Sequence, residues 1–441
     1  MRTPLEDVKI FSARRVAAGV QMQGSAMILS SPQEFVRNGS VPHPFRQDSN
    51  LYYMTGFEEP ETIFIFRPGH NPETVLFVRT KDPERETWDG FRYGVEGAKE
   101  HFRMDKVLPI DEFLKEAPKL LKGIDKLYYR YFKNLHTDHL VNETLKTIKI
   151  NQGRTGFGLI PVYDSDEFIG EFRLRKTAVD IENLKKACEI TAESHVEVMK
   201  YVKPGMTERQ IHGYFIYQIL KRGAAREGYN GIVAGGNNAT TLHYVFNDQP
   251  LKAGEMLLID AAGEYKYFTG DITRTYPINK LFTTEQEIIY SKVLDVQKAV
   301  VASVKPGVKF QSLQEMATDM LVEALLDLGF LTGRKSDIIS SGEHKKYYPH
   351  GVGHFLGMDV HDSGLYFDKK TNEPRAIEEN MTFTVEPGLY FPADDQSIPA
   401  KFRGIGVRIE DNIRVTYSGP DNMTVKAPKE IQDLLKIVGS A

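Results

Sequence analysis

The chain has 441 residues, of which 41% are hydrophobic and 26% are charged, and its formal net charge is -4. This profile is typical of a globular protein with enough apolar material for two domains. Nucleic acid and anionic membranes are not favoured as main partners, because no strongly basic segment stands out. No stretch approaches the ~20 apolar residues that a membrane span requires.

A single cysteine, Cys188, excludes a disulfide within the chain and favours a reducing compartment. It falls on the apolar face of an expected helix, so a buried structural thiol is a better interpretation than a nucleophile. The N-terminal segment 1–7 lacks the apolar core of a secretory signal peptide. We therefore expect a cytoplasmic protein.

Residues 1–173 are expected to form a mixed α/β domain. A helical pattern covers Asp111–Leu121. Segments rich in β-branched and aromatic residues predict four strands, at Ser25–Ser31, Thr62–Arg67, Thr74–Val78 and Lys126–Tyr131. This half contains no cluster of metal-ligand residue types, so we expect it to shape the substrate site or to support oligomerisation.

Residues 174–441 begin with a long expected helix, which ends near Pro204. Its apolar face includes His195, which we interpret as a helix-face histidine and not as a ligand. Thr207 and Gln210 stand at the spacing of a capping box and predict the start of a second helix.

The same order then recurs, 102 residues later if the Lys-Pro-Gly turns at Pro204 and Pro306 are aligned. Thr284 with Glu287 predicts one helix cap, and Ser312 with Glu315 predicts the next. Two rounds of helix, turn, capped helix and strands indicate a duplicated α+β unit. Pro-Gly turns between helices are common, so a chance repetition stays an alternative.

Each half supplies an apolar strand that ends in a carboxylate, Met256–Asp260 in the first and Met381–Glu386 in the second. An acid in such a place is costly to bury unless it is paired or bound to metal. Asp271 stands across an expected hairpin, 261–265, from Asp260.

Four carboxylates and one imidazole lie in apolar or glycine-rich segments: Asp260, Asp271, His354, Glu386 and Glu410. This oxygen-rich set suits Mn²⁺ better than a thiolate zinc site does. The number of carboxylates suits two ions ~3.5–4 Å apart with bridging ligands. Any chain of this length holds many acids, so scattered carboxylates without a common site remain the alternative.

The segment His350–Asp362 contains three histidines spaced by glycines, which fits a metal centre better than dinucleotide binding. It resembles the signature of the aminopeptidase P and prolidase family, the proline-directed pita-bread metallopeptidases. The blocks 259–260, 270–275, 384–388 and 408–411 resemble the other family motifs, in the same order. The runs 46–50, 55–57 and 88–90 of the first domain are similar to aminopeptidase P.

The resemblance implies a pita-bread fold for residues 174–441 and roles for individual residues. Asp260 would hold one divalent ion, His354 and Glu386 the other, and Asp271 and Glu410 would bridge both. The two ions would activate a hydroxide for attack on the scissile carbonyl. Glu386 would carry protons. Relatives usually have glycine where this chain has Ala262, a difference that we expect to alter only the hairpin tip.

The resemblance also implies residues around the substrate. His361 and His243 would flank it, and His361 could stabilise the developing oxyanion. His350, Tyr229 and Arg408 would lie behind the metals or line the proline pocket. Trp88 would reach a neighbouring subunit's site in a homo-oligomer, a dimer or a tetramer. Taken alone, each of these residues could equally be structural.

The expected activity is that of an Xaa-Pro aminopeptidase, which releases the first residue of peptides with proline in second place. Prolidase, which cleaves Xaa-Pro dipeptides, is the alternative within enzymes, because Lys401 and Arg403 could bind a free carboxylate. A non-catalytic pita-bread binding protein is the alternative of another class. It is disfavoured because all five ligands are intact.

Overall fold

The computed structural model describes residues 3–441, which separate into two compact units. One unit ends at Phe172 and the other is Arg173–Ala441. The boundary falls inside helix α7 (Ser165–Leu174). Each unit combines helices with strands, as the sequence predicts.

The first unit is built on a six-stranded sheet with the order β6-β5-β4-β1-β7-β8. Strand β1 pairs antiparallel with β4 and parallel with β7. All four strands predicted from composition are present. The six are β1 (Ser25–Ser30), β4 (Ile63–Phe66), β5 (Thr74–Val78), β6 (Lys106–Pro109), β7 (Lys126–Tyr128) and β8 (Val162–Tyr163).

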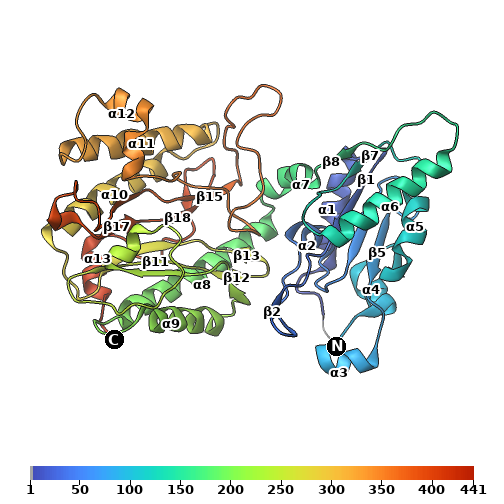
Figure 1. The fold of residues 1–441 in the computed structure, drawn as a ribbon, viewed down its shortest axis with the longest axis horizontal. Coiled ribbons are helices and arrows are strands. Elements are labelled where there is room, and N and C mark those ends of the chain that lie inside the picture. Colours follow the sequence, from blue (N-terminus) through green and yellow to red (C-terminus); the bar gives the residue numbers. More distant parts are fainter. Residues whose placement is uncertain (1–2) are drawn as a thin grey trace. The chain divides into compact units, whose positions relative to one another are not determined.

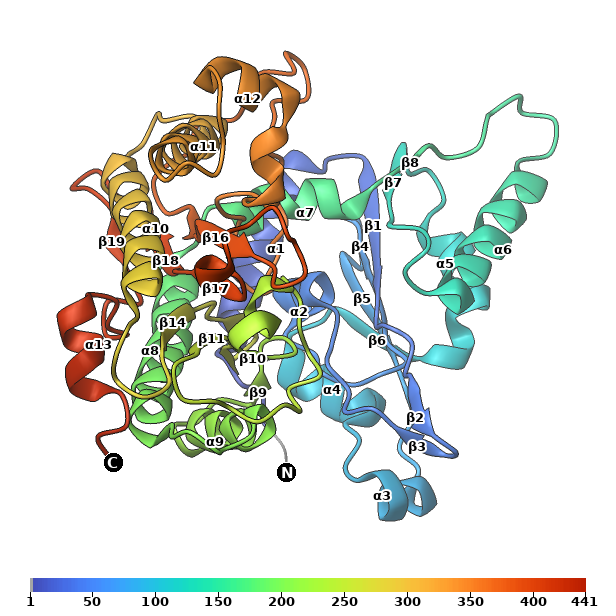
Figure 2. The ribbon, with the colours of Figure 1, turned by 60° about the vertical axis from the view of Figure 1, so that its left-hand side comes forward.

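Helices cover this sheet because successive strand residues point to opposite faces and both faces are apolar. Ile28 and Ile65 pack with α5 (Phe113–Leu120) and α6 (Leu135–Gln152). Figure 2 shows these two helices along one face of the sheet. The predicted helix 111–121 is a 3₁₀ turn followed by α5. The remaining elements are α1 (Val8–Gln21), α2 (Ser49–Thr55), α3 (Pro83–Asp89), α4 (Gly94–Phe102) and the short strands β2 (Val36–Asn38) and β3 (Val41–Pro42).

The second unit places helix pairs on two sides of its strands (Figure 1). Helices α8 (Ala178–Tyr201) and α9 (Glu208–Lys221) form one pair, and α10 (Thr284–Ser303) and α11 (Phe310–Asp327) form the other. Shorter helices are α12 (Lys335–Ser341) and α13 (Ile431–Ile437). Across residues 3–441, no helix combines the length and the apolarity needed to cross a bilayer.

One of the three predicted helix caps is correct and two are not. Thr207 and Gln210 form the capping box of α9. The box of α10 uses Thr283 and Gln286, one residue before the predicted pair Thr284 and Glu287.

Helix α11 begins earlier than the predicted cap at Ser312. The backbone N–H of Phe310 donates to Arg375 O (2.9 Å), and Lys309 forms a β-bridge with Ala376. These contacts place the helix start at Phe310, so Ser312 lies inside the first turn. Its hydroxyl donates to Lys309 O (2.7 Å) and caps no backbone N–H. Glu315 accepts from Gln311 instead of closing a box.

The strands of the second unit recur in the order that a duplication predicts. The first helix pair is followed by the antiparallel set β10 (Ile232–Gly235), β11 (Met256–Asp260) and β14 (Thr273–Pro277). The second is followed by β15 (Thr382–Val385), β18 (Asp411–Arg414) and β19 (Asp421–Asn422). Smaller sheets contain β9 (Arg226–Glu227), β12 (Gly263–Tyr265), β13 (Phe268–Thr269), β16 (Gly388–Phe391) and β17 (Ile405–Arg408).

Candidate metal centre

Strand ends position the five predicted ligands. Asp260 is the last residue of β11, Glu386 directly follows β15, and Glu410 lies between β17 and β18. Asp271 precedes β14. His354 is aligned beside β15, because its backbone exchanges hydrogen bonds with Thr384: His354 N donates to Thr384 Oγ1 (3.1 Å), and Thr384 N donates to His354 O (2.9 Å).

The structure brings these five side chains together. Ligand atoms of Asp271, His354 and Glu410 all lie within 4.8 Å of one another. His354 Nε2 is 3.3 Å from Asp271 Oδ2 and 3.4 Å from Glu386 Oε1. The Tyr229 hydroxyl oxygen lies 2.6 Å from Asp260 Oδ1 and 2.5 Å from Asp271 Oδ1, which connects Asp260 to the group.

The hairpin between Asp260 and Asp271 differs from its prediction. It is formed by β12 and β13, and its tip is Lys266 and Tyr267, both with positive φ. Ala262 is buried and directly precedes β12 in the sequence, so it does not lie at the tip of the hairpin. The tip falls later because the segment first pairs with β9 in a separate sheet.

Electrostatics show that the donor set fits cations. Burial, together with the charge of Asp271, raises the pKa of Glu410 well above its ordinary value, and burial likewise raises the pKa of Asp271 itself. Burial opposes protonation of His354, but Asp271 and Glu386 outweigh it and raise its pKa to about 9. The Tyr229 hydroxyl has one proton to donate, although both Asp260 and Asp271 lie within hydrogen-bond distance of it. Clustered carboxylates with so few donors are a hard, anionic site that divalent ions can neutralise.

Three neighbouring residues orient the predicted ligands. None of them was assigned a role from the sequence. Thr273 Oγ1 donates to Glu410 Oε2 (2.7 Å), and Thr384 Oγ1 donates to Glu386 Oε1 (3.1 Å). Asn412 accepts from the backbone N of Asp271 (2.9 Å) and donates to its carbonyl (2.5 Å). Each of these residues lies within two positions of a predicted ligand, which is the available sequence signal.

Three residues form a polar network beside Asp260. Arg408 donates to Asp260 Oδ2 (2.7 Å) and to the Tyr390 hydroxyl (3.0 Å). His350 Nε2 lies 2.7 Å from the same hydroxyl. Burial and the Arg408 charge lower the pKa of His350 to about 4, so its ring is neutral at pH 7. The sequence predicted Arg408 and His350 here but missed Tyr390, because nothing in β16 distinguishes it from a core tyrosine.

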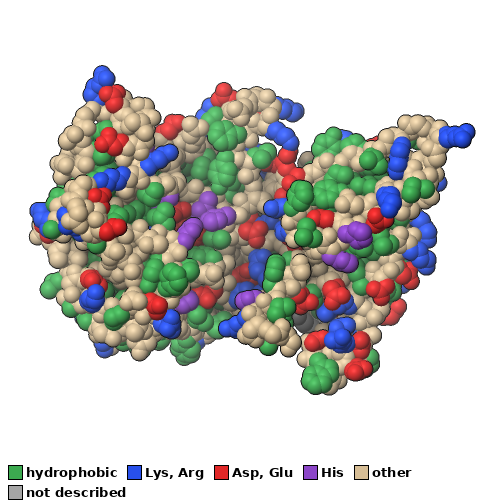
Figure 3. Space-filling model, viewed as in Figure 1, with side chains coloured by type: hydrophobic (Ala, Val, Ile, Leu, Met, Phe, Trp, Pro, Cys, Tyr) green, Lys and Arg blue, Asp and Glu red, His purple; other side chains and the backbone are tan. Residues whose placement is uncertain are grey.

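Two further predicted histidines are exposed near the ligands. The ring of His361 stands edge-on to His354, with 4.5 Å between ring centroids. His243 follows a 3₁₀ turn, Gly236–Thr240. Burial is the main cause that lowers the pKa of His350 and of His361, and the charge of His243 is a smaller cause for both. Figure 3 shows histidine side chains gathered on one face of the larger unit.

Three other residues considered in the sequence have simpler surroundings. Cys188 is fully buried against Asn412, and burial raises its thiol pKa, so it is no nucleophile. His195 is fully buried, with Nε2 2.9 Å from Ala261 O. Both are structural, as predicted. Trp88 lies on α3 of the first unit with 81% of its surface exposed.

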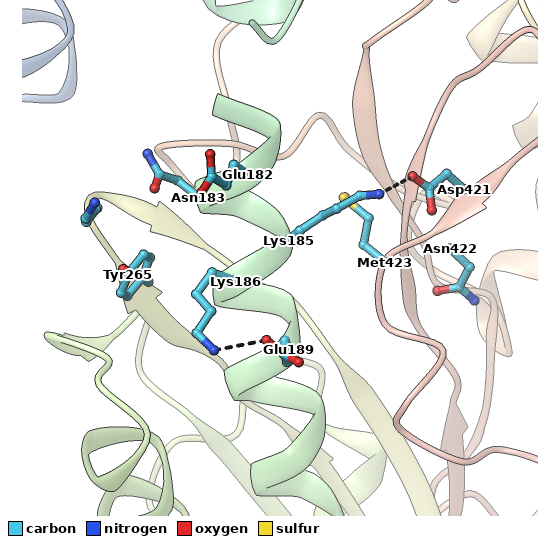
Figure 4. A pocket seen from close by; sticks show the side chains of 10 residues that line it. Glu182, Asn183, Lys185, Lys186, Glu189, Tyr265, Asp421, Asn422 and Met423 are labelled. Carbon is cyan, nitrogen blue, oxygen red and sulfur yellow. Dashed lines mark hydrogen bonds and ion pairs between the residues drawn. The ribbon is translucent and has the colours of Figure 1, made fainter. Parts of the chain in front are cut away.

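A separate cavity of about 460 Å³ lies against α8 (Figure 4). Two of its lysines are paired with its own acids: Lys185 with Asp421 (2.8 Å) and Lys186 with Glu189 (3.0 Å). Figure 4 shows these pairs along the cavity wall. Since none of the five predicted ligands lines this cavity, we assign no reaction to it.

Comparisons with known proteins agree with this geometry. Residues 182–417 match the metallopeptidase family M24, and residues 11–128 match the aminopeptidase P N-terminal domain. The Xaa-Pro aminopeptidase of Haemophilus influenzae is 37% identical over 428 residues, covering 96% of each chain. The chain belongs to the aminopeptidase P family. It is accordingly a metal-dependent Xaa-Pro aminopeptidase, a hydrolase with a pita-bread catalytic domain.

Relatives of known sequence and structure extend over nearly the whole of this aminopeptidase P. The Xaa-Pro aminopeptidase of Escherichia coli is 36% identical and covers 96% of this chain and 97% of its own. The structure of Pseudomonas aeruginosa aminopeptidase PepP has a TM-score of 0.93 at 36% identity, covering 99% and 98% of the two chains. Escherichia coli aminopeptidase P, solved with the inhibitor Pro-Leu, has a TM-score of 0.91 at 34% identity.

Proposed function

We propose that the five converging side chains hold two divalent ions, most favourably Mn²⁺, with the ligand roles stated above. Asp260 would hold one ion, His354 and Glu386 would hold the other, and Asp271 and Glu410 would be shared by both. The observation that carries this proposal is the approach of buried carboxylates within 4.8 Å of one imidazole. When bound, such an ion pair activates water and polarises the scissile carbonyl.

The chain's own residues supply the proton transfers. Burial and the charge of Asp271 raise the pKa of Glu386 to about 7, which suits a group that both takes and gives a proton near neutrality. Thr384 donates to Oε1 of Glu386 and so orients the carboxyl group. We assign Glu386 the transfer of a proton to the proline nitrogen as the bond breaks. His361 and His243 flank the substrate, and His361 stabilises the oxyanion.

The substrates are peptides with proline in second place. The Xaa-Pro bond is a tertiary amide without an N–H, so the site must recognise shape rather than that donor. His350 and Arg408 with Tyr390 would form one wall of the proline pocket. Tyr229 would hold Asp260 and Asp271 in position for the ions.

The structure offers little support for prolidase. Arg403 donates to the carbonyls of Ile398 (2.7 Å) and Gln396 (3.0 Å). Lys401 is paired with Glu285 at 3.1 Å. Both basic groups considered for a free proline carboxylate are therefore engaged elsewhere.

We further propose that residues 1–173 shape the substrate site and support a homo-oligomer, a dimer or tetramer, and that residues 174–441 carry the reaction. The exposed Trp88 is consistent with such an assembly, since a large exposed aromatic is typical of an interface. The single, buried cysteine supports a cytoplasmic location.

The decisive experiment supplies Mn²⁺ and compares alanine release from Ala-Pro-Ala, Ala-Pro and Ala-Ala-Ala. Ala-Pro-Ala should be cleaved fastest, with about two ions per chain. Glu386→Gln should abolish cleavage, while Glu343→Gln, at an exposed glutamate, should not. Preference for Ala-Pro would indicate prolidase. A folded protein with substoichiometric metal and no cleavage would support the non-catalytic alternative.

A further inference from the structure

A buried cluster of charged groups lies next to His361. We call Arg173, Lys176 and Asp362 the Asp362 cluster; their side chains are 3%, 1% and 1% exposed. Asp362 Oδ2 accepts from Lys176 Nζ (2.9 Å), and Oδ1 accepts from Arg173. Burying three charges is costly even when they are paired, so such a cluster calls for a role beyond stability.

The cluster holds the segment that carries His361. Asp362 directly follows His361, and its backbone N–H donates to Phe355 O (2.9 Å). Arg173 also donates to Asp359 Oδ2 (2.7 Å), earlier in the same segment. Residues on both sides of His361 are thereby tied to the start of the catalytic unit.

Gly357 supports this arrangement independently, because a side chain at this position would collide with the Asp362 cluster. A Cβ at position 357 would lie 2.2 Å from Asp362 Oδ2 and 3.0 Å from Lys176 Cε. Any side chain there would displace the Lys176–Asp362 pair. The absence of a side chain at this position therefore makes room for the pair.

His361 depends on its backbone for its direction. Within residues 3–441 its imidazole forms no hydrogen bond, and its ring stands edge-on to His354. With no hydrogen bond to hold the ring, the placement of the main chain at 361–362 decides where the imidazole points. A displacement of about 1 Å in a reacting group can cost roughly 10²-fold in rate.

We propose that Lys176 is a positioning residue for the hydrolysis: through Asp362 it fixes the main chain that directs His361 at the substrate. The proposal rests on the role assigned to His361 above. It concerns a residue without access to the reacting atoms, because Lys176 is buried and paired within the cluster.

The test is a double-mutant cycle between Lys176 and His361 on full-length, Mn²⁺-loaded enzyme. Lys176→Met removes one cation but leaves Asp362 paired with Arg173. We expect kcat on Ala-Pro-Ala to fall about 10–100-fold with KM and bound metal nearly unchanged. Lys176→Arg should restore part of the rate. Lys186→Met is the matched control and should change little, because Lys186 lies on helix α8 and is paired with Glu189 at the surface.

The His361→Ala background separates positioning from general damage. There, Lys176→Met should cost less than about 2-fold, because the group that it positions is already gone. If the rate losses of the two substitutions add, or if Lys176→Met is neutral while His361→Ala is impaired, the proposal for Lys176 is wrong. The role of His361 would stand in both cases. A fully active His361→Ala would overturn the role given to His361, and the proposal with it.

A second variant keeps the proposal testable if Lys176→Met does not fold. Gly357→Ala keeps every charge but pushes against the Lys176–Asp362 pair. It should reduce kcat in the wild-type background and have little effect in His361→Ala. If Gly357→Ala is neutral in both backgrounds, the pair does not position His361.

Discussion

Arg408 donates a hydrogen bond from Nη2 to Oδ2 of Asp260 across 2.7 Å. The contact joins the end of β17 to the end of β11, and so connects the two halves of the duplicated unit. Arg408 is buried and donates in addition to Tyr390 and Thr273. One guanidinium thus orders two hydroxyl groups and the carboxylate of Asp260, which we propose as a metal ligand.

Replacing this arginine should weaken both metal binding and catalysis. We expect Arg408→Met to lower metal affinity about 10–100-fold, the usual cost of losing an orienting partner. The ratio kcat/KM should fall by a similar factor. Titration calorimetry with Mn²⁺ and steady-state kinetics on Ala-Pro-Ala measure the two effects.

Arg403→Met is the matched control, because that guanidinium binds loop carbonyls away from the ligands. It should leave metal affinity within about 2-fold. Wild-type metal binding in Arg408→Met would show that Asp260 needs no orienting partner.

Removing the metal should make stability fall as pH rises. In the metal-free protein the folded-state pKa of Glu386 is about 7, above its ordinary value of 4.5. The folded state then binds more protons than the unfolded state between these values. This contribution to stability is complete below pH 4.5 and is lost as pH rises through 7.

Thermal unfolding after chelation should therefore give a lower Tm at pH 7.5 than at pH 6, and Mn²⁺ should restore the pH 7.5 value by binding the folded state. In Glu386→Gln the drop between the two pH values should be smaller. An equally large drop in that variant would assign the effect to other groups.

His195 should make the protein sensitive to acid in the opposite sense. Burial lowers its pKa from 6.5 to about 4. The unfolded state binds more protons between these values, so stability is lost as pH falls from 6.5 towards 4. His195→Gln should remove on the order of 2 kcal/mol of the stability difference between pH 7 and pH 5.

Urea unfolding at the two pH values measures this difference. His139→Gln, at an exposed position of α6, is the control and should leave the pH dependence as in the wild type. An unchanged slope in His195→Gln would mean that His195 is protonated while folded.

The helix caps seen in the structure predict different losses of unfolding free energy for two similar substitutions. Thr283 accepts from Gln286 N in the capping box of α10, whereas Ser312 caps no N–H. Thr283→Ala should cost about 1 kcal/mol of unfolding free energy, and Ser312→Ala a few tenths. Urea midpoints compare them. Equal costs would place a functional cap at Ser312.

Much of this structure could be predicted because it depends on near neighbours in the sequence. The strands at 63–66 and 74–78, the box of Thr207 with Gln210, and carboxylates at the ends of β11 and β15 all follow from local pattern. The cap at Ser312 was wrong because a β-bridge to Ala376, distant in the chain, decided where α11 begins.

The sequence by itself determined the family, the candidate ligands and their place near strand ends, since motifs and periodicity are local properties. Only the tertiary structure decided which side chains meet. Tyr390 reaches Arg408 from the neighbouring strand β16, and Lys176 reaches Asp362 across 186 positions. Such pairs form because the packed core brings remote segments together and a buried charge must then find a partner, which no local pattern specifies.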